Sequence, residues 1–269
     1  MSIPASKLSD RQLREQNYYN TYRKQNGVTD VTFDFVFDGI ERSWNSYWIV
    51  YNTALKHFKN SDQKLLEIGC GPGISAMRYA KMGYNVYGFD ISEQNIECCE
   101  RLAEKYQFSD KTHFSVETAE ALPFESNSFD IVTGLDILHH IDIEPSMREV
   151  YRVLKPGGIA VFKECIEVPM WEKIRNWNIV LRYFPKEESF ETHITHDERK
   201  LSAEDVRVIS QIFHGCTVKR YGIFTRLSRL WPDSDQKLLG KLQRLDHTIV
   251  RLVPSIEKLG GSAVLFVKK

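Results

Sequence analysis

The segment 65–73, Leu-Leu-Glu-Ile-Gly-Cys-Gly-Pro-Gly, constrains the fold of this chain more than any other. It is a short apolar run that closes with Glu67-Ile68 and passes at once into a glycine-rich turn. Glycine lets a backbone turn sharply and approach a ligand without a Cβ clash. Asp90 follows Gly69 by 21 residues, the spacing at which a carboxylate meets ribose hydroxyls across two adjacent strands. The pattern therefore predicts a parallel sheet whose first turn holds a nucleoside-like ligand.

Short apolar runs and amphipathic runs alternate from residue 64 to residue 163. We expect strands at 64–68, 86–89, 113–116, 129–133 and 159–163, with helices at 73–82, 92–106 and 144–154. Strands separated by helices of this length form parallel βαβ units. Right-handed crossovers then bring the carboxyl ends of the strands to one edge, where open α/β sheets bind ligands.

Composition excludes several classes of protein. The 36 basic residues balance 36 acidic ones and 42% of the chain is hydrophobic, which argues against a disordered chain or a dedicated nucleic-acid binder. Five cysteines without a CxxC pair predict neither a disulfide framework nor a zinc site, and we expect no metal. The first residues contain no apolar signal segment, and no apolar run reaches the roughly 18 residues that span a bilayer. We expect a cytoplasmic protein with no membrane partner and no stable nucleic-acid binding.

The glycine turn differs from the dinucleotide fingerprint GxGxxG, because Ile74 stands where the third glycine belongs. A pyrophosphate needs bare amides and close access to a helix N-terminus, whereas a ligand without phosphate does not. S-adenosylmethionine has a ribose, an adenine, a sulfonium and an amino-acid end. The acidic Glu67 beside the turn suits the ammonium of that end, directly or through water.

At this point the chain resembles the class I S-adenosylmethionine-dependent methyltransferases, in the branch that includes the quinone-ring methyltransferases. The resemblance covers about residues 64–163, and five motifs of the family occur in order. They are the segments 67–73, 88–92, 119–124 with 128–130, 137–141 and 149–158. The resemblance implies an α/β fold: a Rossmann-like sheet of seven strands with helices on both faces. It also implies S-adenosylmethionine as methyl donor and S-adenosylhomocysteine as product.

The resemblance assigns a cofactor site residue by residue. It implies that Asp90 holds the ribose diol and that Ile91 packs on the adenine. Thr118 stands where the family usually has an aspartate that contacts the adenine amino group, and a hydroxyl is a weaker acceptor. The other candidate cofactor residues are Glu67, Gly69, Cys70, Gly71, Ala119, Glu120, Leu135 and, from an N-terminal lid, Tyr19.

The candidate catalytic residues are His139, His140 and Glu164. Both histidines follow the fourth expected strand and Glu164 ends the fifth, so all three lie at the edge of the sheet where the cofactor is expected. A histidine there can take a proton from an acceptor hydroxyl while a carboxylate orients it. The alternative is a structural pair of histidines below the site. Tyr19 and its neighbouring tyrosines are alternatively plain helix-packing residues.

The chain divides into a helical lid segment at 1–60, a cofactor-binding core at 61–165, a cap insertion at 166–215 and the last strands and helix at 216–269. Within the cap we expect a helix at 171–184 and a charged loop at 185–200 with His193 and His196. The expected function is methyl transfer to an oxygen or nitrogen of a small molecule by a monomer or homodimer. The alternatives are a protein or RNA methyltransferase and a non-catalytic protein that binds S-adenosylmethionine.

Overall fold

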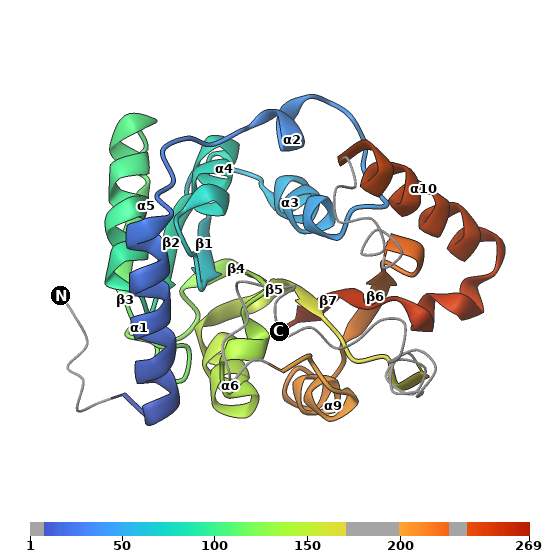
Figure 1. Cartoon of the computed structure of the whole chain (residues 1–269). Coiled ribbons are helices and arrows are strands. Elements are labelled where there is room, and N and C mark those ends of the chain that lie inside the picture. The colour runs from blue at the N-terminus through green and yellow to red at the C-terminus, as the bar shows by residue number, and fades with distance from the viewer. Residues whose placement is uncertain (1–7, 171–198, 226–235) are drawn as a thin grey trace.

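Seven strands form one sheet in the order β3-β2-β1-β4-β5-β7-β6 (Figure 1). The structure is a computed structural model and describes residues 8–170, 199–225 and 236–269. Neighbouring strands run parallel from β3 to β5, whereas β7 is antiparallel to both β5 and β6. The strands are β1 (Lys64–Ile68), β2 (Asn85–Asp90), β3 (Thr112–Val116), β4 (Phe129–Leu135), β5 (Leu154–Cys165), β6 (Thr217–Tyr221) and β7 (Ser262–Lys268). The expected seven-stranded α/β fold is confirmed.

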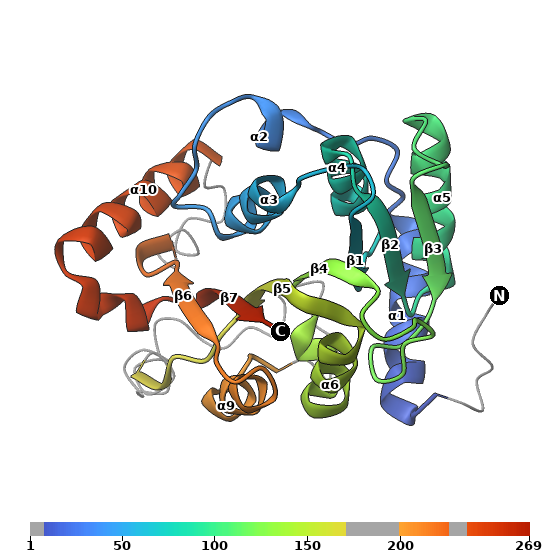
Figure 2. The same cartoon turned by 180° about the vertical axis from the view of Figure 1, so that it is seen from behind.

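Helices cover both faces of the sheet, as Figures 1 and 2 show from opposite sides. The longer helices are α1 (Asp10–Gln25), α3 (Ser46–His57), α4 (Ile74–Met82), α5 (Glu93–Lys105), α6 (Ile143–Val153), α9 (Ala203–Ile212) and α10 (Gln236–Leu252); the short ones are α2 (Asp34–Phe37), η2 (Leu138–His140) and η4 (Pro254–Leu259). Successive side chains of a strand point to opposite faces. In β1, Leu65 therefore joins a core with α3, α4 and α5, and Leu66 joins a core with α6 and α9.

Local signals in the sequence fix several helix ends. The side chain of Ser9 accepts from the backbone of Gln12, and the side chain of Gln12 accepts from the backbone of Ser9, so the capping box that begins α1 is present. Ser92 caps α5 by accepting from the backbone nitrogen of Asn95 at 3.2 Å. Gly83 ends α4 in a left-handed conformation. These short-range patterns are the part of the fold that the sequence predicts most directly.

The segment expected as a cap is only partly described. Its expected helix at 171–184 and most of its charged loop, including His193 and His196, lie outside the described residues. α9 falls within the same predicted range, yet it packs on α6, and Ile209 belongs to the main core. At least this part of the stretch completes a layer of the sheet domain.

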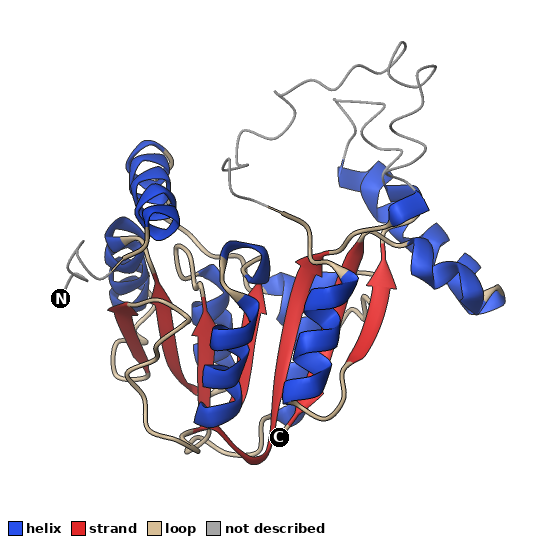
Figure 3. Cartoon of the chain, turned by 90° about the horizontal axis from the view of Figure 1, so that it is seen from below, coloured by secondary structure: helices blue, strands red, loops and turns tan. Residues whose placement is uncertain are grey.

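The carboxyl ends of β1, β2 and β4 meet at one edge of the sheet, and α1 lies beyond that edge (Figure 3). α1 packs against α5, which anchors it at the β2 side of this edge. Among the described residues, no helix is long and apolar enough to cross a membrane.

Candidate active site

A cavity of about 220 Å³ lies at the carboxyl edge of the sheet, between the strand ends and α1. Its walls come from α1, from the turns after β1, β2 and β3, and from the segment after β4. The lining residues include Gln12, Glu15, Tyr19, Arg23, Gly69, Gly71, Asp90, Ile91, Glu117, Thr118, Ala119, Glu120, Leu135, Asp136 and His140. Nine of the eleven candidate cofactor residues are among them, and Glu67 and Cys70 are not.

The glycine turn lets the backbone form the floor of the cavity. Gly69 has a φ of 60°, and a Cβ added there would lie 2.4 Å from Cδ1 of Ile137. Gly71 has a φ of 51° and donates its backbone N–H to Oδ2 of Asp90 at 2.9 Å. A side chain at position 69 would therefore collide with the segment after β4, and both positions favour glycine.

Asp90 is held rigidly at the end of β2. Besides Gly71, its carboxylate accepts from the backbone nitrogen of Ser92 at 2.9 Å and from Nδ2 of Asn95 at 3.1 Å. Burial raises the pKa of this carboxyl, while these three donors oppose the rise. The result is a preorganised acceptor in the cavity wall, suited to a pair of vicinal hydroxyls.

Glu67 and Cys70 lie behind the turn. Glu67 is 2% exposed, and its Oε2 atom has no hydrogen-bond partner among the described residues. Burial raises the pKa of Glu67 to about 8. The Sγ of Cys70 is 3.8 Å from the Sγ of Cys99, within a small buried cluster. Any effect of these two side chains on a bound ligand is therefore exerted through the turn or through water.

The third wall is the segment after β3, where Thr118 and Ala119 line the cavity. Glu120 accepts from Nε2 of Gln12 at 3.0 Å and from the backbone nitrogen of Asp142 at 3.1 Å. Its carboxylate thus ties this segment both to α1 and to the start of α6.

α1 closes the cavity through polar side chains that the sequence analysis missed, apart from Tyr19. Gln16 donates from Nε2 to the carbonyl of Ile91 at 3.0 Å, and Arg23 donates from Nε to Asn95 at 2.8 Å. Together with Gln12 and Tyr19, these residues recur every three or four positions, which is one face of a helix. That periodicity was the signal available in the sequence, although it does not reveal what the face contacts.

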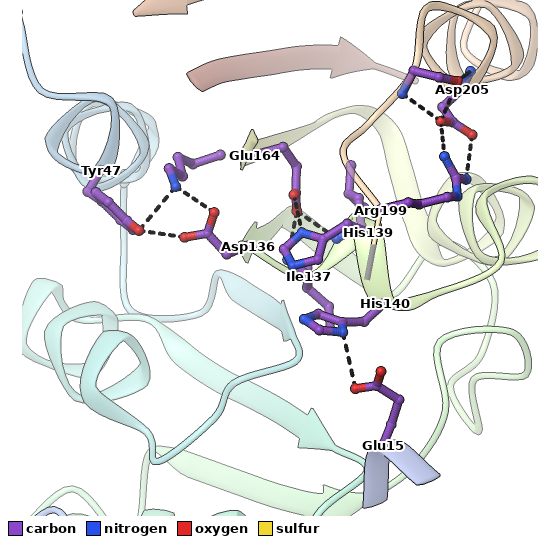
Figure 4. A network of polar contacts seen from close by, with 12 residues as sticks. Glu15, Tyr47, Asp136, Ile137, His139, His140, Glu164, Arg199 and Asp205 are labelled. Atoms are coloured by element: carbon purple, nitrogen blue, oxygen red, sulfur yellow. Dashed lines mark hydrogen bonds and ion pairs between the residues drawn. The ribbon is translucent and has the colours of Figure 1, made fainter. Parts of the chain in front are cut away.

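Glu164 braces the segment after β4 (Figure 4). It is fully buried, and its Oε1 accepts from the backbone nitrogens of Ile137 and Leu138, both at 2.6 Å. Its Oε2 lies 2.8 Å from Nδ1 of His139. Both oxygens therefore have protein partners, and the carboxylate orients His139 rather than facing the cavity.

His140 is the histidine that lines the cavity. Its Nε2 is 3.1 Å from the hydroxyl of Tyr19. Its Nδ1 is 3.1 Å from Oε2 of Glu15 (Figure 4). Glu15 is 4% exposed. Two side chains of α1 thus contact the two ring nitrogens of one histidine of the core.

Asp136 is a cavity residue that the sequence analysis missed. It has a φ of 53°, unusual for a residue other than glycine, and such strained residues concentrate at functional sites. Its carboxylate lies 2.5 Å from Nζ of Lys163 and 2.5 Å from the hydroxyl of Tyr47 (Figure 4). Burial lowers the pKa of Lys163, but the charge of Asp136 more than compensates and leaves that pKa above its ordinary value. No sequence pattern indicates this left-handed aspartate.

The cavity is rich in carboxylates, and among its lining residues Arg23 is the one arginine or lysine. The acidic lining residues are Glu15, Asp90, Glu117, Glu120 and Asp136. Such a lining fits a ligand with cationic groups. In the described part of the chain, no group of three or more histidine, cysteine or acidic side chains is arranged to hold a metal ion.

Fold and site together define a nucleoside-binding α/β domain, and comparison with known proteins identifies its class. Residues 66–162 match the family model described as a methyltransferase domain. A ubiquinone biosynthesis O-methyltransferase from Dinoroseobacter shibae is 31% identical over 180 residues, which are 65% of this chain and 69% of that protein. A 27-O-demethylrifamycin SV methyltransferase from Amycolatopsis mediterranei is 38% identical over 108 residues, 39% of this chain and 40% of the relative.

Among solved structures, a geranyl diphosphate C-methyltransferase from Streptomyces coelicolor, in complex with Mg²⁺, geranyl diphosphate and S-adenosyl-L-homocysteine, superposes with a TM-score of 0.60. The alignment covers 98% of each chain at 15% identity. The cyclase SpnF superposes with a TM-score of 0.59 over 100% of this chain and 99% of its own, at 18% identity. These two likenesses show the fold alone.

The chain belongs to the class I S-adenosylmethionine-dependent methyltransferases, as the sequence motifs predicted. S-adenosylmethionine is the cofactor of this family, and the cavity fits it: a carboxylate for the ribose, a bare glycine floor and an acidic lining for the cationic groups.

Proposed function

We propose that this protein transfers the methyl group of S-adenosylmethionine to an oxygen or nitrogen of a small molecule. The observation that carries the proposal is the position of His140 and Tyr19 in the wall of the same cavity that presents Asp90. A site that binds only the cofactor needs Asp90 and the glycine turn, but it needs no proton acceptor nearby.

The proposed cofactor contacts follow from the lining. Asp90 accepts both ribose hydroxyls, Ile91 and Leu135 pack on the nucleoside, and the segment from Thr118 to Glu120 borders the adenine. Bound S-adenosylmethionine supplies an electrophilic methyl group on a sulfonium. The acidic lining favours this cationic cofactor over S-adenosylhomocysteine, whose sulfur carries no charge. This difference in affinity helps to release the product.

His140 is the proposed general base. With S-adenosylmethionine bound, an acceptor hydroxyl would lose its proton as it takes the methyl group, and His140 would receive that proton. Glu15 at Nδ1 favours the tautomer in which Nε2 carries the lone pair, so that the proton reaches Nε2 directly or through the hydroxyl of Tyr19. His139 and Glu164 are proposed as positioning residues that hold the segment after β4.

Asp136 is proposed to face the acceptor. Asp136 lines the cavity, and its carboxylate, which contacts Lys163 and Tyr47, has further lone pairs. An acceptor that donates a hydrogen bond would therefore have a fixed partner in the cavity wall.

The experiment is a transfer assay with methyl-labelled S-adenosylmethionine, purified protein and a cell extract separated into small-molecule, protein and nucleic-acid fractions. We expect label in the small-molecule fraction, and we expect the Asp90→Ala variant to lose it. His140→Gln should retain affinity for S-adenosylhomocysteine in calorimetry while losing transfer. Label confined to protein or RNA would make the substrate class wrong.

A further inference from the structure

The outer face of α10 combines exposed apolar side chains with cations. Of the seven large apolar side chains that are exposed in the described part of the chain, three lie on α10 or directly after it. They are Leu245, Leu252 and Val253, with exposed fractions of 46%, 77% and 47%. Most soluble proteins scatter such residues singly, so a cluster calls for an explanation.

The helical repeat arranges this face in two rows. Leu245 and Leu252 are seven residues apart, nearly two turns, and therefore lie along one line of the helix. Arg244 and Arg251 have the same spacing and form a neighbouring row. Both are exposed, and the guanidinium of Arg244 also lies over the ring of Trp44, 4.8 Å from its centroid. Lys241, one turn before Leu245, is exposed as well. An apolar row thus runs beside a basic row.

The acidic residues of this segment point inward. Asp246 is 4% exposed, and its carboxylate accepts from the backbone nitrogens of Ile223 at 2.9 Å and Phe224 at 2.7 Å. Glu257 in η4 accepts from the backbone nitrogen of Arg220 at 2.7 Å. Both carboxylates are therefore used within the fold, and the exposed charges of α10 are all positive.

We propose that this outer face of α10, formed by Lys241, Arg244, Leu245, Arg251, Leu252 and Val253, binds the surface of an anionic lipid bilayer. A helix with leucines beside a row of arginine and lysine lies in the plane of an interface, with its apolar row in the acyl boundary and its cations at the phosphates. Two copies of this face would bring like charges together, so the charge pattern favours an anionic surface over a second copy of the chain.

This binding mode is compatible with the absence of a spanning helix in the described residues. The expectation of no membrane partner rested on the length that a spanning segment needs, and a helix lying on the surface needs no such length. α1 and α10 both lie beyond the same end of the sheet in Figure 3.

The test is co-sedimentation of the full chain with vesicles of phosphatidylcholine and phosphatidylglycerol, compared with phosphatidylcholine alone. We expect binding to the anionic vesicles that weakens with added salt. Leu252→Asp should lower the partition coefficient about tenfold, and Arg251→Glu at least about fivefold.

Two matched variants serve as controls. Leu55→Asp changes a leucine of α3 that is 38% exposed, and Arg148→Glu changes an exposed arginine of α6. Both should leave the partition unchanged, and circular dichroism and binding of S-adenosylhomocysteine check that every variant is folded. Equal binding to neutral vesicles, no binding at all, or equal losses in the controls would overturn the proposal. So would light scattering that shows a dimer which Leu252→Asp dissociates.

Discussion

Glu67 should make the stability of the protein fall as the pH rises from 5 to 8. Its carboxyl is 2% exposed, and burial raises its pKa from 4.5 to about 8. The folded chain therefore keeps the proton through a range in which the unfolded chain has lost it. The stabilisation is complete below pH 4.5 and disappears as the pH rises through about 8. The slope is about 1.4 kcal/mol for each pH unit and flattens near both pKa values, so the loss between pH 5 and pH 8 is about 3.5 kcal/mol.

The assay is denaturant unfolding of the wild type and Glu67→Gln across this pH range. Glutamine has the shape of the protonated carboxyl and does not titrate, so the variant should gain about 3.5 kcal/mol relative to the wild type between pH 5 and pH 8. Glu100→Gln, at an exposed position of α5, is the control and should follow the wild type. Parallel pH profiles for the wild type and Glu67→Gln would refute the reasoning, because Glu67 would then be ionised in the folded protein throughout.

Three further predictions concern the cavity. Asp90→Asn should lower the affinity for S-adenosylhomocysteine about 10- to 100-fold in calorimetry, because hydrogen bonds to a charged group contribute about 1.5–3 kcal/mol; an unchanged affinity would place the ribose elsewhere. In thermal unfolding, Gly69→Ala should destabilise the protein by about 1–3 kcal/mol more than Gly157→Ala. Both glycines have a positive φ, but only a Cβ at position 69 would collide with a neighbour, Ile137. His140→Gln should lower kcat about 10²- to 10⁴-fold with little change in the KM for S-adenosylmethionine, and a normal kcat would exclude it as the base.

The sequence predicted the sheet because its signals are local. The apolar runs at 64–68 and 129–133 lie within β1 and β4, and the helix expected at 92–106 is α5, which Ser92 caps. Strand β5 begins earlier than expected, at Leu154, because that residue pairs with Phe129 beyond a register shift. The glycine turn and Asp90 were predictable for the same reason. They follow two adjacent parallel strands, β1 and β2, and their spacing along the chain indicates that they lie close together.

The contacts of α1 could not be predicted because they join residues more than 70 positions apart. Gln16 reaches Ile91, and Tyr19 reaches His140, only after α1 has packed against α5. The periodic polar face of α1 is compatible with simple exposure to water, so its pattern does not distinguish a lid from a surface helix. Sequence motifs therefore predicted the floor of the cavity and left most of its cover undetermined.

Two adjacent residues at the end of β5, Lys163 and Glu164, hold different parts of the segment that follows β4. Lys163 pairs with Leu135 in the register of the two strands, and its neighbour Glu164 points to the opposite face. Lys163 therefore holds Asp136 on one side, while Glu164 holds the turn with His139 on the other. Two adjacent residues of one strand fix both a cavity carboxylate and the segment that presents His140. A change at either position should disturb the segment after β4 and leave the glycine turn, which follows β1, in place.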